Sequence, residues 1–166
     1  KINREDYSEF QTEIKNITVD EIRPEFADFN RDITKLKIKE NIPLYYIKNT
    51  DNELFYLNII SDIGTNQNKK LSLATAFFDY LSTSKFTSFQ IKEEFYKLAC
   101  SYNVSVTDDQ LTVSLSGLNE NFEKSLKLLE EIISDPVVNK EALENLKADI
   151  LKQREDRTDM HLVDGK

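Results

Sequence analysis

The stretch Leu73–Thr87, which reads LATAFFDYLSTSKFT, marks the point where the pattern of the chain changes from strands to helices. Around it, Leu71, Ala74, Phe78 and Leu81 recur at steps of three and four residues, the spacing of one buried helical face. Alternation of polar and apolar residues, which is typical of half-buried strands, precedes the stretch. A second helical pattern follows it. We therefore expect a helix that packs on a sheet.

Three strands are expected before this helix. They lie at residues 33–38, 43–48 and 54–62, and the turn residues 49–52 separate the last two. In the third strand, one side carries Phe55, Leu57 and Ile59, and the other side carries Tyr56 and Ile60. Because both faces carry apolar side chains, we expect an interior strand that is covered on both sides.

Capping and turn residues mark where the helices and the hairpin of the second half of the chain begin and end. Thr87 and Gln90 form a capping box that begins a helix, and we expect its face to continue through Tyr102. A hairpin with strands near 104–106 and 111–115 turns at Asp108-Asp109. Asn119 is a good N-cap for the next helix, which we expect to bury Phe122, Leu126, Leu129 and Ile133 and to end at Asp135-Pro136. Asn139 caps the last helix.

This order of elements predicts an α+β fold. Three strands, two helices, a hairpin and two further helices favour a largely antiparallel sheet with helices packed over it. The 166 residues, 39% of them hydrophobic, suffice for one core. We expect residues 1–32 to form a leader with a short helix at 4–15, and residues 33–166 to form a single domain.

Composition excludes several classes of function. The formal net charge of −8 leaves no basic stripe that could neutralise phosphates, so we expect no nucleic-acid partner. No apolar run approaches the length of a membrane span. The single cysteine, Cys100, cannot form an internal disulfide, and its apolar neighbours favour a buried thiol rather than a nucleophile.

Residues 76–80 can be laid on an inverted zinc motif. That motif spaces its residues His-x-x-Glu-His on one helix, whereas this chain offers Ala76, Phe77, Phe78, Asp79 and Tyr80. Alanine cannot bind zinc, and tyrosine is not one of the usual zinc ligands. Asp79 keeps a carboxylate at the glutamate position, but it is one methylene shorter.

The ordered features resemble the pitrilysin (insulinase, or mitochondrial processing peptidase) family of zinc metallopeptidases. The resemblance runs from about Ile33 to the last helix. It rests on Asn49, the run 54–57, the turn Asp62-Ile63-Gly64, the 76–80 slot, the helix 88–98, the turn 116–122 and Asp135-Pro136. The family resemblance implies a metallopeptidase-like domain that is truncated at its C-terminus.

The resemblance also implies a division of labour. Family members pair homologous halves, one with zinc and one without, that close around a peptide. This chain resembles the non-catalytic half, so the resemblance implies a peptide-binding chamber wall, a zinc-bearing half as partner and a peptide substrate. Zinc is then expected in the catalytic half of the parent metalloendopeptidase and no cofactor in this fragment. A periplasmic or cell-envelope setting follows from family habit.

No catalytic, cofactor-binding or metal-ligating residue is assigned. The family's third ligand is a glutamate on a downstream helix, but Glu141, Glu144 and Asp149 are ordinary for a solvated helix face, so none is carried over. His161, the only histidine, has no partner ligand. Phe77, Phe78 and Tyr80 could line a chamber, although core packing is the general preference of aromatic side chains.

An alternative belongs to another class of protein. The chain could be a structural or assembly subunit, related to the peptidases but without a substrate, whose aromatic face meets a permanent protein partner. A His-x-x-Glu-His motif elsewhere in the same or an adjacent gene separates the two hypotheses, because it favours the peptidase.

Overall fold

The computed structural model describes residues 7–18, 24, 26, 28–39 and 41–163, with side chains through residue 156. Its contacts divide the chain into two compact units, residues 1–48 and 49–166. The first two strands therefore group with the leader. The predicted start of the family domain near Ile33 stays a prediction.

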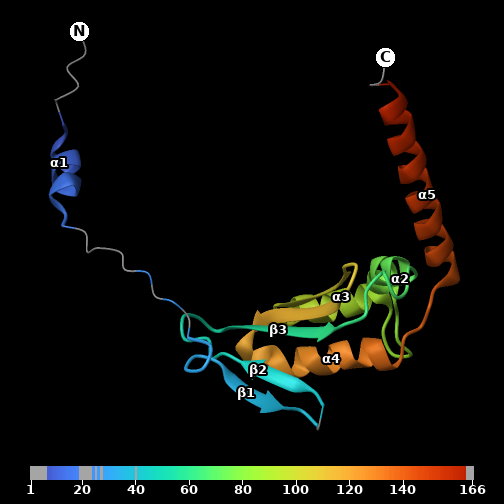
Figure 1. Cartoon of the computed structure of the whole chain (residues 1–166), viewed down its shortest axis with the longest axis horizontal. Coiled ribbons are helices and arrows are strands. Elements are labelled where there is room, and N and C mark those ends of the chain that lie inside the picture. The colour runs from blue at the N-terminus through green and yellow to red at the C-terminus, as the bar shows by residue number, and fades with distance from the viewer. Residues whose placement is uncertain (1–6, 19–23, 25, 27, 40, 164–166) are drawn as a thin grey trace. The chain divides into compact units, whose positions relative to one another are not determined.

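The first unit holds a short helix and a hairpin (Figure 1). Helix α1, Glu9–Asn16, begins at a capping box in which the Gln11 amide donates to the Ser8 hydroxyl at 3.2 Å. Strands β1, Thr34–Lys37, and β2, Pro43–Tyr46, pair antiparallel, as expected. Part of the predicted helix, residues 4–6, lies outside the described residues.

The second unit is built on a three-stranded antiparallel sheet (Figure 1). Its strands are β3, Leu54–Ser61, β4, Cys100–Val106, and β5, Leu111–Leu118, in the order β3-β5-β4. Among the described residues β3 is therefore an edge strand. The prediction of an interior strand covered on both faces was wrong, because Tyr56 is 72% exposed and Ile60 is 59% exposed.

Helices cover one face of this sheet. The structure places α2 at Leu71–Phe77, a 3-10 turn η1 at Phe78–Tyr80, α3 at Ser88–Lys97, a 3-10 turn η2 at Asn119–Asn121, α4 at Phe122–Ser134 and α5 at Lys140–Val163. The Thr87–Gln90 capping box is confirmed, and so is the end of α4 before Asp135-Pro136. The Ala142 amide donates to the Asn139 side chain at 3.2 Å, which confirms the last cap.

Three details of the predicted helices were wrong. Asn119 begins a 3-10 turn rather than capping α4, and Asn121 occupies the cap position without a side-chain bond. The buried face of α4 also differs from the predicted one: Leu128 and Ile132 are buried beside Leu129, whereas Ile133 is exposed. Tyr102 does not extend α3. It lies in β4.

The core fills the space between the sheet and the helices α3 and α4. Its buried side chains come from one face of the sheet and from both helices: Ile91, Phe95, Cys100, Leu115, Leu128, Leu129 and Ile132. Cys100 is buried as expected, with its thiol donating to the Leu98 carbonyl at 3.3 Å. Phe55, Leu57 and Tyr102 pack against the core from the same face of the sheet. This arrangement confirms the predicted α+β class.

Candidate functional site: the slot of a zinc motif

Residues 76–80, called the motif slot below, do not share one helical face. Helix α2 ends at Phe77, and Asp79 and Tyr80 lie in the 3-10 turn that follows. In an α-helix the first and last positions of the motif, four residues apart, would lie on the same face. A 3-10 turn instead aligns residues three apart. The backbone of the slot therefore departs from the metal-binding arrangement, in addition to its missing histidines.

Aromatic rings pack in and around the motif slot. Phe77 is buried and stacks on Tyr80, with ring centroids 5.7 Å apart. Phe78 meets the ring of Tyr102 edge-on at 5.7 Å, and Tyr102 in turn lies 4.7 Å from Phe95 in the core. Core packing, the general preference of aromatic side chains, thus describes Phe77 and Phe78. Tyr80 remains 44% exposed.

The carboxylate of Asp79 interacts with the hydroxyl of Tyr102, a residue of strand β4. Burial, then the charge of the nearby Asp79 carboxylate and a hydrogen bond to it, raise the pKa of the Tyr102 hydroxyl to about 12. The Tyr102 hydroxyl is therefore neutral at physiological pH and can donate to that carboxylate. Sequence reasoning missed Tyr102 because it assigned the residue to α3. The alternation of Cys100, Tyr102, Val104 and Val106 is the signal that could have placed it in the strand.

The segment after the motif slot is fastened to the segment after α4. Ser82 and Val137 exchange two backbone hydrogen bonds, of 3.1 and 2.7 Å. The Ser84 amide donates to the Asp135 carboxylate at 3.0 Å, and the pKa of Asp135 is lowered first by a hydrogen bond from the Ser84 side chain and then by this backbone bond. Hydrogen bonds to residues 135 and 137 therefore fix the position of residues 82–84, which directly follow the motif slot.

Metal ligands do not gather anywhere in the described part of the chain. No group of three or more His, Cys, Asp or Glu side chains there is placed to hold an ion. Glu144, one of the acidic residues of the last helix, pairs with Lys147 at 2.7 Å on the helix surface. The side chain of His161 lies outside the described residues. None of the described helices combines the length and apolar character that crossing a bilayer requires.

The free edge of β4 runs beside the motif slot. At the hairpin turn the Thr107 amide donates to the Gln110 carbonyl at 2.8 Å, so Thr107 is a residue of β4–β5 pairing whose backbone groups point toward the partner strand. Because inward and outward groups alternate along an antiparallel strand, Tyr102, Val104 and Val106 direct their N–H and C=O groups away from β5. No backbone partner for these groups is found among the described residues. An extended polypeptide could pair with them.

A family model for the insulinases (peptidase family M16) matches residues 75–164. That range contains the whole motif slot, α3, the β4–β5 hairpin, α4 and α5. A search of curated proteins gave no match.

Several solved structures share the fold. A peptidase M16 inactive domain from Pseudomonas fluorescens matches with a TM-score of 0.68 and 19% identity, over 76% of this chain and 32% of that one. A protease from Helicobacter pylori gives 0.63 and 13% over the same shares. The periplasmic protease PqqL from Escherichia coli gives 0.65 and 16%, over 81% of this chain and 16% of that one. The chain thus spans a third or less of these proteins.

Proposed function

The chain belongs to the insulinase family, peptidase family M16, and on this premise we propose that it is a non-catalytic domain that helps enclose a peptide. The zinc that would hydrolyse the peptide is then held by another half of the same parent or by a partner subunit. This domain supplies part of the chamber wall. Its own role is binding.

The observation that carries this proposal is the motif slot, packed with aromatic rings and lying beside a free strand edge. A zinc peptidase activates water by lowering the pKa of a metal-bound molecule. With Ala76 and Tyr80 at the histidine positions, Asp79 has no such water to deprotonate. The adjacent β4 edge retains the outward backbone groups of Tyr102, Val104 and Val106, which suit an extended peptide. Binding is thus separated from chemistry.

The matched structures fit this division of roles. One of them is described as an inactive domain, and another as a periplasmic protease. By analogy we place the parent of this chain in the periplasm or cell envelope. We assign it a zinc-bearing half as partner and unfolded peptides as ligands.

Binding can be measured with a synthetic peptide that carries one tryptophan. The chain has no tryptophan, so all indole emission comes from the peptide. We expect saturable binding, and slower hydrogen exchange at the amides of Tyr102, Val104 and Val106 in the bound state. Val104→Pro removes one outward donor and should weaken binding, whereas the matched Val104→Ala keeps the N–H and should bind normally. Unchanged exchange along β4 at saturating peptide would refute this site.

A second candidate function is favoured by the outer side of α3. Phe89 is 70% exposed and Tyr96 87% exposed, and with Lys92, Glu93 and Lys97 they line a shallow apolar hollow. Such a patch suits a permanent protein partner, as in a structural or assembly subunit. That role predicts no peptide binding at β4. It also predicts that no His-x-x-Glu-His motif occurs in the same gene or an adjacent one.

A further inference from the structure

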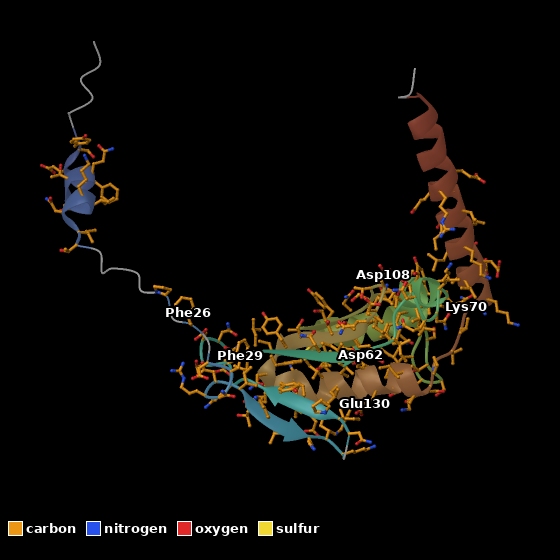
Figure 2. All side chains as sticks on the ribbon, in the orientation of Figure 1. Phe26, Phe29, Asp62, Lys70, Asp108 and Glu130 are labelled. Atoms are coloured by element: carbon orange, nitrogen blue, oxygen red, sulfur yellow. The ribbon has the colours of Figure 1, made fainter. Side chains whose placement is uncertain are left out.

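The carboxylate of Asp79 is exposed and forms no ion pair within the described part of the chain. The basic residue before it, Lys70, labelled in Figure 2, lies at the other end of α2. The basic residue after it, Lys85, pairs with Glu131 at 3.1 Å. An exposed carboxylate is ordinary by itself, so its role depends on the groups that lie beside it.

Asp79 is held next to strand β4. Its carboxylate accepts a hydrogen bond from the Tyr102 hydroxyl. The ring of Tyr102 contacts the rings of Phe78 and Phe95, with centroid distances of 5.7 and 4.7 Å, so the position of the hydroxyl is fixed by packing. Tyr102 projects from the same face of β4 as the buried Cys100. The carboxylate therefore lies on the helix side of β4, at the level of the Tyr102 hydroxyl.

A peptide paired antiparallel with β4 would place one of its side chains beside this carboxylate. The backbone groups of Tyr102 point away from β5, so they would exchange both hydrogen bonds with the peptide residue directly opposite. Residues directly opposite in an antiparallel pair project from the same face, with Cβ atoms about 5 Å apart. The side chain of that peptide residue would therefore run alongside the side chain of Tyr102, toward Asp79.

The charge of Asp79 decides which side chain suits this position. An apolar side chain would remove water from the carboxylate without replacing its hydrogen bonds, and an acidic one would repel it. A metal ion has no support here, because no group of three or more ligands gathers among the described residues. Lysine and arginine are long enough to reach the level of a tyrosine hydroxyl, and their charge-assisted hydrogen bonds are roughly twice as strong as those of a neutral donor.

We propose that Asp79 selects peptides that carry a basic side chain at the residue opposite Tyr102. The carboxylate at the glutamate position of the motif slot then acts as a specificity residue, which contributes to affinity and not to catalysis. This assignment deepens the proposed function and rests on it, because it takes the edge of β4 as the place where the peptide pairs.

Two peptides that differ at one residue test the proposal on the full chain. Both alternate valine and threonine, carry one tryptophan and have capped, uncharged ends. The central residue is arginine in one and citrulline, its neutral analogue of equal length, in the other. We expect the arginine peptide to bind about threefold more tightly at low salt, as for an exposed ion pair, and the difference to shrink at about 0.5 M salt. Both peptides should slow hydrogen exchange at Tyr102, Val104 and Val106.

Two variants separate the charge of Asp79 from the net charge of the chain. Asp79→Asn retains an acceptor for the Tyr102 hydroxyl but removes the charge, and should bring the two peptides to equal affinity. Glu53→Gln removes an equal charge next to β3, at the other edge of the sheet, and should leave the preference for arginine unchanged. Because the effect is on affinity, a saturating peptide still binds to every variant.

The outcomes distinguish this proposal from the proposed function. Equal binding of both peptides to the unaltered chain, with protection along β4, would overturn the proposal and leave the proposed function standing. A preference for arginine that survives Asp79→Asn, or that Glu53→Gln abolishes as well, would have the same meaning. No protection along β4 with either peptide would overturn both.

Discussion

Replacing Gly64 with alanine should disrupt the turn that joins β3 to the segment before α2. A Cβ at this position would lie 2.1 Å from the Asp108 carbonyl oxygen and 2.3 Å from the Asp109 nitrogen, both of them backbone atoms. The loop is held against the β4–β5 hairpin by the amides of Thr65 and Asn66, which donate to the Thr107 and Asp108 carbonyls at 2.9 Å each. The alanine and these hydrogen bonds cannot both be accommodated.

The size of the effect follows from the displacement. Ordinary carbon contacts begin near 3.5 Å, so the loop and the hairpin must separate by more than about 1 Å. Overpacking alone costs roughly 1–3 kcal/mol. Each backbone hydrogen bond stretched or lost adds about 0.5–1.5 kcal/mol. We therefore expect Gly64→Ala to lower the free energy of unfolding by about 2–4 kcal/mol.

Urea denaturation followed by circular dichroism measures this change. Thr65→Ala is a matched control at the neighbouring position: it removes only the exposed hydrogen bond from the Thr65 hydroxyl to the Asp108 carboxylate, of 3.1 Å, and should cost less than about 1 kcal/mol. A Gly64→Ala chain within about 0.5 kcal/mol of the unaltered protein, with the same denaturant slope, would refute the reasoning.

Three further predictions concern the core, the residue that joins α3 to β4, and the tyrosine beside the motif slot. Leu129→Ala removes a side chain that is 1% exposed, and should lower the free energy of unfolding by about 2–5 kcal/mol in urea, unlike the exposed Leu151→Ala. Ala99 has φ of +48°, which favours glycine, so Ala99→Gly should raise the free energy of unfolding in urea by up to about 1 kcal/mol; a decrease would contradict this. The raised pKa of Tyr102 means that the folded state holds this proton more tightly than the unfolded state, so its stabilising contribution is lost as pH rises from 10 to about 12. Tyr102→Phe should flatten that part of the stability profile, and an unchanged profile would show that the tyrosine does not titrate as described.

Features set by neighbouring residues could be predicted from the sequence. The Thr87–Gln90 capping box and the cap at Asn139 depend on side chains that reach backbone groups within three residues. The hairpin turn at Asp108-Asp109 and the end of α4 before Pro136 are likewise local. In each case the residues that decide the structure are adjacent in the chain, so no tertiary context was needed.

Features set by distant contacts were predicted wrongly. The apolar residues on both faces of β3 predicted an interior strand, but which edge of a sheet is paired depends on partners that periodicity cannot identify. The residues of α4 that are buried, Leu128, Leu129 and Ile132, are set by how the helix packs on the sheet, which the spacing of apolar residues alone did not decide. The break at Phe78 within the motif slot was missed because Phe78 and Tyr80 suit either a helix or a turn. The absence of both histidines, however, could be read directly from the sequence.

The most direct test of the account is a cleavage measurement with zinc present. The full chain is incubated with a saturating, unfolded synthetic peptide and zinc, and the peptide is followed by mass spectrometry. The account predicts that the peptide is bound and recovered intact, and that Asp79→Ala changes neither result. Zinc-dependent cleavage that disappears in Asp79→Ala would contradict it.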